Sequence, residues 1–269
     1  MKQSVVLSLV LFLAVSANAA VIASLTASNE VLVPVAGSGT GVNGTFFRSD
    51  IRVTNLRSQD QLVHLFWLPQ DRTGIGIAPI VITIPANGKI SSEDFTTDVM
   101  NQTGLGAIVA RAVRDDGSID TEGVLDVSTR IWTPATTGQG TVSQNLDSLE
   151  ARRIVNRRVV ILGQRRDERF RTNVGIINLD RDTPQTYRIT VSGDNPTLIA
   201  ETKEVPVEPY SMVQVALPGF AQPNLSIDIE VLPIPGGGFG TLWAAYGASV
   251  DNVNGDSWSS IAFNRVGSP

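Results

Sequence analysis

Residues 47–56 (FRSDIRVTNL) and 170–179 (FRTNVGIINL) are nearly the same ten-residue phrase, and in the first copy the apolar residues fall at alternate positions between polar ones. The apolar positions of the first copy are Phe47, Ile51 and Val53. Side chains of a β-strand point alternately to its two faces, whereas a helix would scatter these residues around its circumference. We therefore expect each phrase to be a half-buried strand, with Phe, Ile and Val facing the core, Arg facing solvent and an Asn capping the turn that follows.

The surroundings of the two phrases also correspond, and in the same order. The matching segments are 61–68 with 185–192, 82–89 with 203–210, and 125–140 with 242–257. A match that keeps its order over most of the chain indicates an internal duplication. We expect copy 1 at residues 20–145, a linker at 146–157 and copy 2 at 158–269.

Further alternating runs follow each phrase, separated by turn-forming pairs such as Asn87-Gly88 and Asp116-Gly117. Only residues 91–104 resemble a helix, and we expect one or two turns there. Seven or so short strands per copy are typical of an antiparallel sandwich. The chain is therefore predicted to be all-β.

Three segments of the second copy carry a resemblance to a known group of proteins. They are FRTNVGIIN (170–178), EVPVEPYS (204–211) and AYGASVDNVNGD (245–256). Together they resemble secreted bacterial proteins with tandem immunoglobulin-like β-sandwich domains. The resemblance implies two such domains in an exported protein and implies no activity. Copy 1 departs from it at its end, where residues 128–140 read STRIWTPATTGQG.

The first 19 residues have the pattern of a secretory signal peptide. Lys2 precedes an apolar run at 5–15, and Ala17-Asn18-Ala19 forms an A-x-A cleavage site. We expect an exported protein, periplasmic or extracellular, with no transmembrane segment in the mature chain. The net charge of −5 argues against a nucleic-acid partner, and the absence of cysteine rules out disulfides and thiolate metal sites.

The inventory of catalytic residues is short. His64 is the only histidine, and it is expected on the polar side of its strand. One His and no Cys exclude the usual zinc sets and a Cys–His pair. A Ser–His–acid triad through His64 stays open, but no G-x-S-x-G elbow accompanies it. We expect no catalytic residues and no enzymatic activity.

Two kinds of segment could still bind small ions. The glycine-rich residues 36–45 run into a strand instead of a helix, so they lack a phosphate-binding helix N-terminus and are expected to be a flexible connection. The acidic segments 114–123 and 251–256 offer oxygen ligands for calcium without following the regular calcium-loop spacing. We expect no cofactor, with calcium as the alternative.

An arginine-rich segment at 150–171 is the strongest anomaly of composition. Its members are Arg152, Arg153, Arg157, Arg158, Arg165, Arg166, Arg169 and Arg171. They could form a basic patch for an acidic polysaccharide, a phosphate-rich surface or an acidic protein. Alternatively, they flank a strand, keep the linker solvated and pair with nearby acids. We favour the second reading, because the runs of arginine lie on both sides of the predicted domain boundary.

These features predict a secreted, non-enzymatic binding or structural module of the bacterial cell envelope or extracellular space, with a protein or polysaccharide partner. Loops at the ends of a sandwich are free to carry recognition. One alternative is a carbohydrate-active enzyme or its accessory domain. Another is an envelope assembly or adhesion subunit that pairs through a strand edge.

Overall fold

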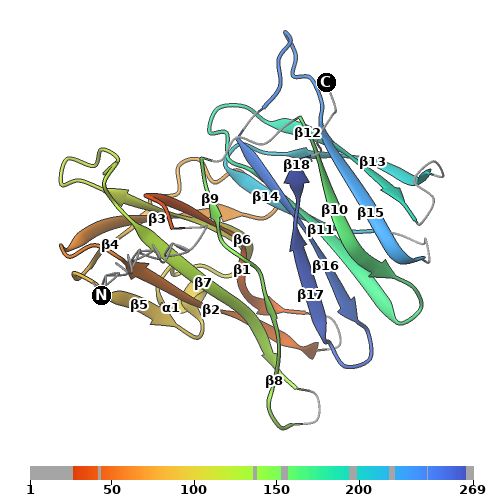
Figure 1. Ribbon diagram of the computed structural model, residues 1–269, viewed down its shortest axis with the longest axis horizontal. Coiled ribbons are helices and arrows are strands. Elements are labelled where there is room, and N and C mark those ends of the chain that lie inside the picture. Colours follow the sequence, from red (N-terminus) through yellow and green to blue (C-terminus); the bar gives the residue numbers. More distant parts are fainter. Residues whose placement is uncertain are drawn as a thin grey trace, which may run out of the picture.

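The computed structural model describes residues 27–41, 44–135, 138–152, 157–193, 199–217, 222–240 and 242–264. These residues lie mostly in antiparallel strands, which confirms the all-β class (Figure 1). The expected signal peptide at 1–19 is outside the described residues. In the described chain the one helix is α1 (Phe95–Asp98), within the segment where one or two turns were predicted. No helix among the described residues is long and apolar enough to cross a membrane.

The first half of the described chain, residues 27–152, contains two sheets. Sheet 1 has the order β4 (Ile80–Ile84), β3 (Gln61–Pro69), β6 (Gly104–Val113), β1 (Glu30–Thr40) and β9 (Leu149–Glu150). Sheet 2 has the order β5 (Lys89–Ser92), β2 (Phe46–Asn55), β7 (Leu125–Pro134) and β8 (Thr141–Asn145). The end of β1 also pairs with β2 and joins the two sheets. The segment predicted as a linker, 146–157, contains β9 and is therefore partly strand.

The second half, residues 157–264, also contains two sheets. Sheet 3 has the order β13 (Ile199–Val207), β12 (Gln185–Ser192), β15 (Gln222–Val231), β10 (Arg158–Arg166) and β18 (Phe263–Asn264). Sheet 4 has the order β14 (Ser211–Ala216), β11 (Phe170–Asn178), β16 (Trp243–Asp251) and β17 (Ser257–Ile261). The strands of sheet 3 are paired in the same order as their counterparts in sheet 1, and those of sheet 4 in the same order as their counterparts in sheet 2.

The repeated phrases form β2 and β11, which occupy matching places in sheets 2 and 4. Ile51 and Val53 are buried in the core of the first half, as predicted from the alternation. The predicted Asn cap is also confirmed. The Asn55 amide donates to the carbonyls of Gln59, Ile84 and Pro85, at 2.7, 3.3 and 3.1 Å.

Phe47 and Phe170, which begin the phrases, do not join either core as predicted. Both are half-buried near the first residues of their strands. Phe170 packs edge-on against Trp258, with ring centroids 5.4 Å apart. The prediction was wrong here because alternation assigns a residue to one face of the strand but does not show whether that face is covered along its whole length.

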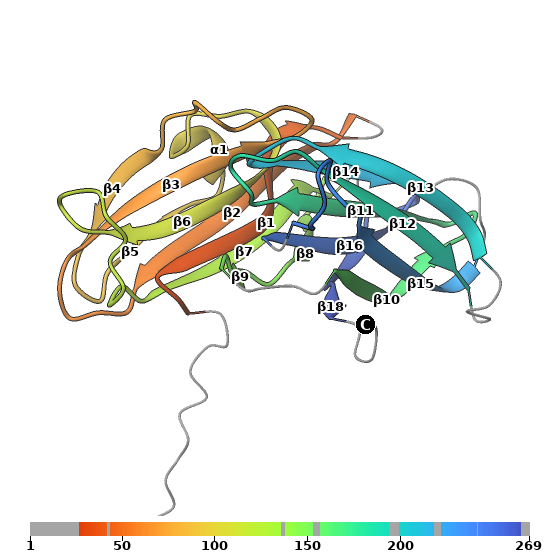
Figure 2. The same ribbon diagram turned by 90° about the horizontal axis from the view of Figure 1, so that it is seen from above.

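Three apolar cores hold the molecule together. One lies between sheets 1 and 2 and another between sheets 3 and 4. The third lies between the halves, where the outer face of sheet 1 packs on the outer face of sheet 4 (Figure 2). Its largest members are Phe66 of β3, Tyr210 and Tyr246 of β16; the rings of Phe66 and Tyr210 meet edge-on at 5.9 Å. The two halves are thus joined by a buried interface.

This third core explains where the two halves differ in sequence. Strand pairing places Phe66 at the position of Thr190, and Val109 at the position of Asp228. The apolar member lies in the interface between the halves, whereas the polar member lies on the outer face of sheet 3. There Asp228 pairs with Arg158 at 3.3 Å. Equivalent strands of the two halves therefore carry apolar residues where the outer face packs on the other half, and polar residues on the outer face of sheet 3.

Two expectations about local structure need correction. Residues 36–40 are not a flexible connection, since they form the last part of β1. The overlay of the final segments, which places Leu125 over Leu242, is also shifted by one residue. Leu125 pairs with Asn55, while Trp243 pairs with Asn178, so Leu125 corresponds to Trp243. Strand β16 is apolar on both faces, and its alternation therefore did not fix the register.

Candidate functional site

A cleft of about 540 Å³ lies where the two halves meet, at one end of the interface. One wall is the outer face of sheet 4, formed by β11, β14 and β16. The opposite wall comes from the last part of β1 and from the hairpin of β7 and β8. This volume is within the range of roughly 300–1,000 Å³ typical of small-ligand sites. Both halves are therefore needed to form the cleft.

The β1 wall is made of main chain, because residues 37–41 read GSGTG and all five line the cleft. Ser49 of β2 holds this wall in place: its hydroxyl accepts from the Gly37 N–H at 2.7 Å and donates to the Gly37 carbonyl at 3.0 Å. A side chain at Gly37 would stand 2.8 Å from the carbonyl oxygen of Gly104. Glycine is required here by the close approach of β6.

The wall formed by sheet 4 carries polar side chains. Arg171 and Asn173 of β11 line it, together with Gln214 of β14. The Tyr246 hydroxyl donates to Oε1 of Gln214 at 2.7 Å, which orients that amide. Burial raises the pKa of Tyr246, so its phenol stays protonated. The wall offers amide and hydroxyl groups on an otherwise apolar surface.

Arg171 is the only charged side chain among the described residues that line the cleft. It is half-buried, and it donates to Oδ1 of Asn252 at 2.7 Å. Burial lowers the pKa of the Arg171 guanidinium, because removal from water disfavours the charged form. The cleft lining thus carries one positive charge, and the hydrogen-bond partner of that group is a neutral amide.

Most of the other predicted patch residues form ion pairs within the chain. The ion pairs are Arg152 with Glu30, Arg157 with Glu230, Arg158 with Asp228, Arg165 with Asp167 and Arg169 with Asp251. Arg166 is half-buried on β10, and none of the ion pairs found in the described chain includes it. Arg153 lies outside the described residues. Five of the eight arginines thus face carboxylates of the chain itself.

The acidic segments proposed for calcium also pair with arginine. Asp120 pairs with Arg57 at 2.7 Å, and Glu122 pairs with the same guanidinium at 3.3 Å. Asp251 pairs with Arg169 at 2.6 Å, and that hydrogen bond lowers the pKa of the Asp251 carboxyl. In the described residues, no three carboxylate or imidazole groups come together as a metal site.

His64 lies on the outer face of sheet 1, away from the cleft. Its ring meets Phe66 edge-on, with the centroids 6.1 Å apart. Burial and the charge of Arg111 lower the pKa of His64, so the imidazole is neutral at physiological pH. Its place beside the apolar interface gives it a packing role.

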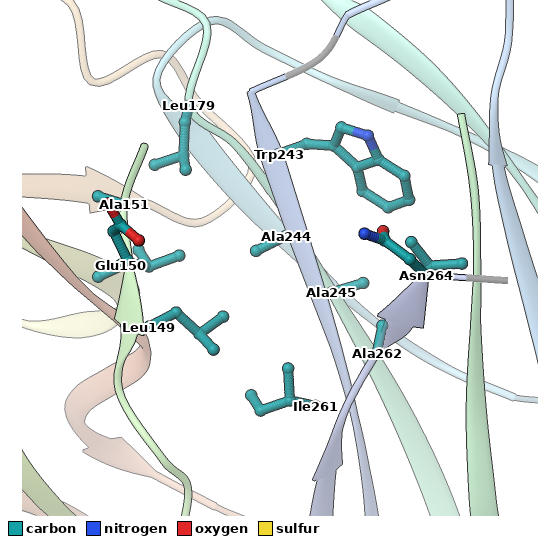
Figure 3. A pocket seen from close by; sticks show the side chains of 12 residues that line it. Leu149, Glu150, Ala151, Leu179, Trp243, Ala244, Ala245, Ile261, Ala262 and Asn264 are labelled. Atoms are coloured by element: carbon teal, nitrogen blue, oxygen red, sulfur yellow. The ribbon is translucent and has the colours of Figure 1, made fainter. Parts of the chain in front are cut away.

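A second, much smaller void of about 20 Å³ lies farther along the interface (Figure 3). Figure 3 shows residues 149–151 on one side of it and Ala244 and Ile261 on the other. A void needs roughly 10–15 Å³ to hold one water molecule, so this one has room for little more. It is a packing defect between the halves, and the larger cleft is the candidate site.

No protein-family model and no curated protein matches this chain. The candidate site therefore rests on its geometry. The arginine-rich segment predicted as a possible patch includes Arg171, but the cleft was not predicted from the sequence. The available signal was the change from Arg52 and Thr54 in the first phrase to Gly175 and Ile177 in the second, which marks the outer face of β11 as covered.

Proposed function

We propose that this protein is an exported, non-enzymatic binding protein of the bacterial envelope or extracellular space, and that it holds its ligand in the cleft between its halves. The observation that carries the proposal is the cleft itself, a site of about 540 Å³ with walls from both halves and Arg171 as its one charged lining residue among those described. In this proposal residues 1–19 serve as the export signal.

We further propose that the halves are duplicated immunoglobulin-like domains. The support is the shared order of strand pairing and the matching caps. The Asn178 amide donates to the carbonyls of Thr183, Val207 and Glu208 at 2.9, 3.3 and 3.1 Å. These are the counterparts of the three carbonyls bound by Asn55. When two copies of a domain pack together through one outer face each, a cleft can form along the line where they meet.

The lining of the cleft favours binding over hydrolysis. Hydrolysis of a glycoside commonly uses two carboxyl groups that flank the bond. The described lining supplies one guanidinium with hydroxyl and amide groups, which hydrogen-bond a ligand without moving a proton to or from it. A carbohydrate-active enzyme remains the second candidate, because these groups suit a sugar.

The proposal is tested by narrowing the cleft at a position that does not carry charge. Ala216 lies at the exposed end of β14 and lines the cleft, so Ala216→Trp fills space without disturbing a core. The matched control is Val81→Trp on β4, where the side chain is 54% exposed and is not part of the cleft lining. Residues 20–269 with each change are titrated with neutral and acidic oligosaccharides and with peptides.

We expect Ala216→Trp to weaken binding at least tenfold and Val81→Trp to leave it unchanged. Equal binding by the two variants would place the ligand elsewhere and remove the cleft from consideration. Release of shortened saccharides from any substrate would instead support the enzyme candidate.

A further inference from the structure

We infer that the cleft binds an acidic oligosaccharide, with a sugar carboxylate on Arg171 and sugar hydroxyls on the neutral polar side chains around it. This inference rests on the proposed function and names its ligand class. Three features of the described residues carry it: the pairing of Arg171, the chemistry of the lining and the state of the nearby strand edges.

The first feature is that Arg171 has a neutral partner. Five arginines of the same segment form ion pairs with carboxylates, whereas Arg171 donates to the Asn252 amide. No carboxylate lines the described part of the cleft. A guanidinium presents a planar fork that matches a carboxylate, and hydrogen bonds between two charged groups are stronger than those to a neutral amide. An incoming carboxylate would therefore gain a strong contact at Arg171.

The second feature is the number of neutral groups that both donate and accept. Hydroxyl groups come from Thr40, Ser143 and Ser257, and amides come from Gln144, Asn173 and Gln214. A sugar hydroxyl likewise donates and accepts, so it can pair with the hydroxyls and amides in either sense, and with Gln214 through the amide N–H, since Oε1 of Gln214 already accepts from Tyr246. Apolar residues such as Phe47 and Val250 stand between them and suit the C–H faces of a sugar ring.

The third feature concerns the strand edges beside the cleft, which a peptide ligand would use. The edge of β14 is engaged by the first half at Met212, whose carbonyl accepts from the Asp71 N–H at 3.0 Å. The edge of β8 faces β17, and the Ser259 hydroxyl donates to the Asn145 carbonyl at 2.6 Å. Addition of a peptide strand needs a free edge. Recognition by side chains, as in saccharide binding, is thus favoured over strand pairing.

The experiment compares acids with their esters. Oligomers of galacturonate, of mannuronate and of glucuronate are titrated into residues 20–269, each beside its carboxyl methyl ester. The variants are Arg171→Gln and, as the matched control, Arg48→Gln, since Arg48 holds the equivalent place on β2 and lies outside the cleft. Melting temperatures establish that both variants are folded.

We expect at least one uronate oligomer to bind better than its ester. Arg171→Gln should weaken binding of the acid roughly 10- to 100-fold, from the loss of hydrogen bonds between charged groups, and should leave the ester unchanged. Arg48→Gln should have no effect. Binding of the acid should also weaken as salt is raised.

Equal affinity for acid and ester, or an equal loss in Arg48→Gln, would overturn the inference. So would tighter binding of peptides with a free C-terminal carboxylate than of every saccharide. If neutral saccharides bind and Ala216→Trp blocks them, the proposed function stands while this inference falls. If Ala216→Trp blocks nothing, the proposed function itself falls.

Discussion

The ring of Tyr246 occupies the space that a side chain on Gly175 would need. These residues face each other across the pairing of β11 with β16, on the face of sheet 4 that packs against the first half. The equivalent of Gly175 in the first half is Arg52, which is exposed on the outer face of β2. The size of residue 175 is thus limited by the Tyr246 ring, which itself packs in the interface between the halves.

The first prediction follows from this contact. Gly175→Arg, which copies the residue of the first phrase, must displace the Tyr246 ring and put a charge into an apolar interface. We expect it to lower the free energy of unfolding by about 3 kcal/mol or more, since overpacking alone typically costs about 1–3 kcal/mol. Urea denaturation measures the change.

The matched control for that prediction is Arg52→Ala, which removes the equivalent exposed side chain. It should change the free energy of unfolding by less than about 0.5 kcal/mol. An equally small effect of Gly175→Arg would mean that the interface yields to a large side chain, contrary to the packing seen here.

The second prediction concerns the buried caps. Asn178 donates to three main-chain carbonyls, and its Oδ1 accepts from the Asp180 N–H at 3.0 Å. Asn178→Ala leaves these groups unpaired in a fully buried site, so we expect a loss of about 2–4 kcal/mol in the free energy of unfolding. Asn178→Asp should cost at least as much, because a carboxylate would face three carbonyl oxygens.

Asn55→Ala removes the equivalent cap of the first half and should cost a similar amount. Thr202→Ala, on an exposed strand position, serves as the control and should be nearly neutral. A cost below about 1 kcal/mol for both Asn variants would show that water replaces the amide, and that the cap is not a main determinant of stability.

Alternation in the sequence was sufficient to predict the inward residues of the central strands. Ile51 and Val53 face the first core, and the cap that follows them is formed as expected. Alternation separates the residues of a strand into two faces, but it does not show what packs against each face. For β11 the second face is also buried, so Ile177 lies in the interface between the halves. Alternation within one phrase does not contain this information, and only the comparison of the two phrases points to a covered outer face of β11.

The candidate site was less predictable for the same reason. Arg171 could be singled out only as one of the eight arginines of its segment, because the carboxylate partners of four of the others lie far along the chain. Arg157, for example, pairs with Glu230 at 2.7 Å across sheet 3. Register between distant strands decides which arginine is neutralised. The cleft itself exists only after both halves have folded and packed.

The last prediction is a pH dependence at Glu30, a buried residue of β1. Burial alone would raise the pKa of this carboxyl, but hydrogen bonds from Arg111 and Arg152, both 2.7 Å long, outweigh it and hold the pKa below its usual value. A lowered pKa in the folded state stabilises the protein above the pKa of the unfolded chain, about 4.3 for Glu. That contribution is lost as pH falls through the folded pKa.

Glu30→Gln should therefore lower the free energy of unfolding at neutral pH by about 1–3 kcal/mol, the typical value of hydrogen bonds to a charged group. The difference from the natural chain should shrink as pH falls below about 4. Glu168→Gln makes the same change of charge at an exposed position and should show neither effect. Urea denaturation from pH 7 to 3 measures all three proteins. A difference for Glu30→Gln that is constant over this range would mean that packing of the side chain, and not its charge, joins β1 to β6.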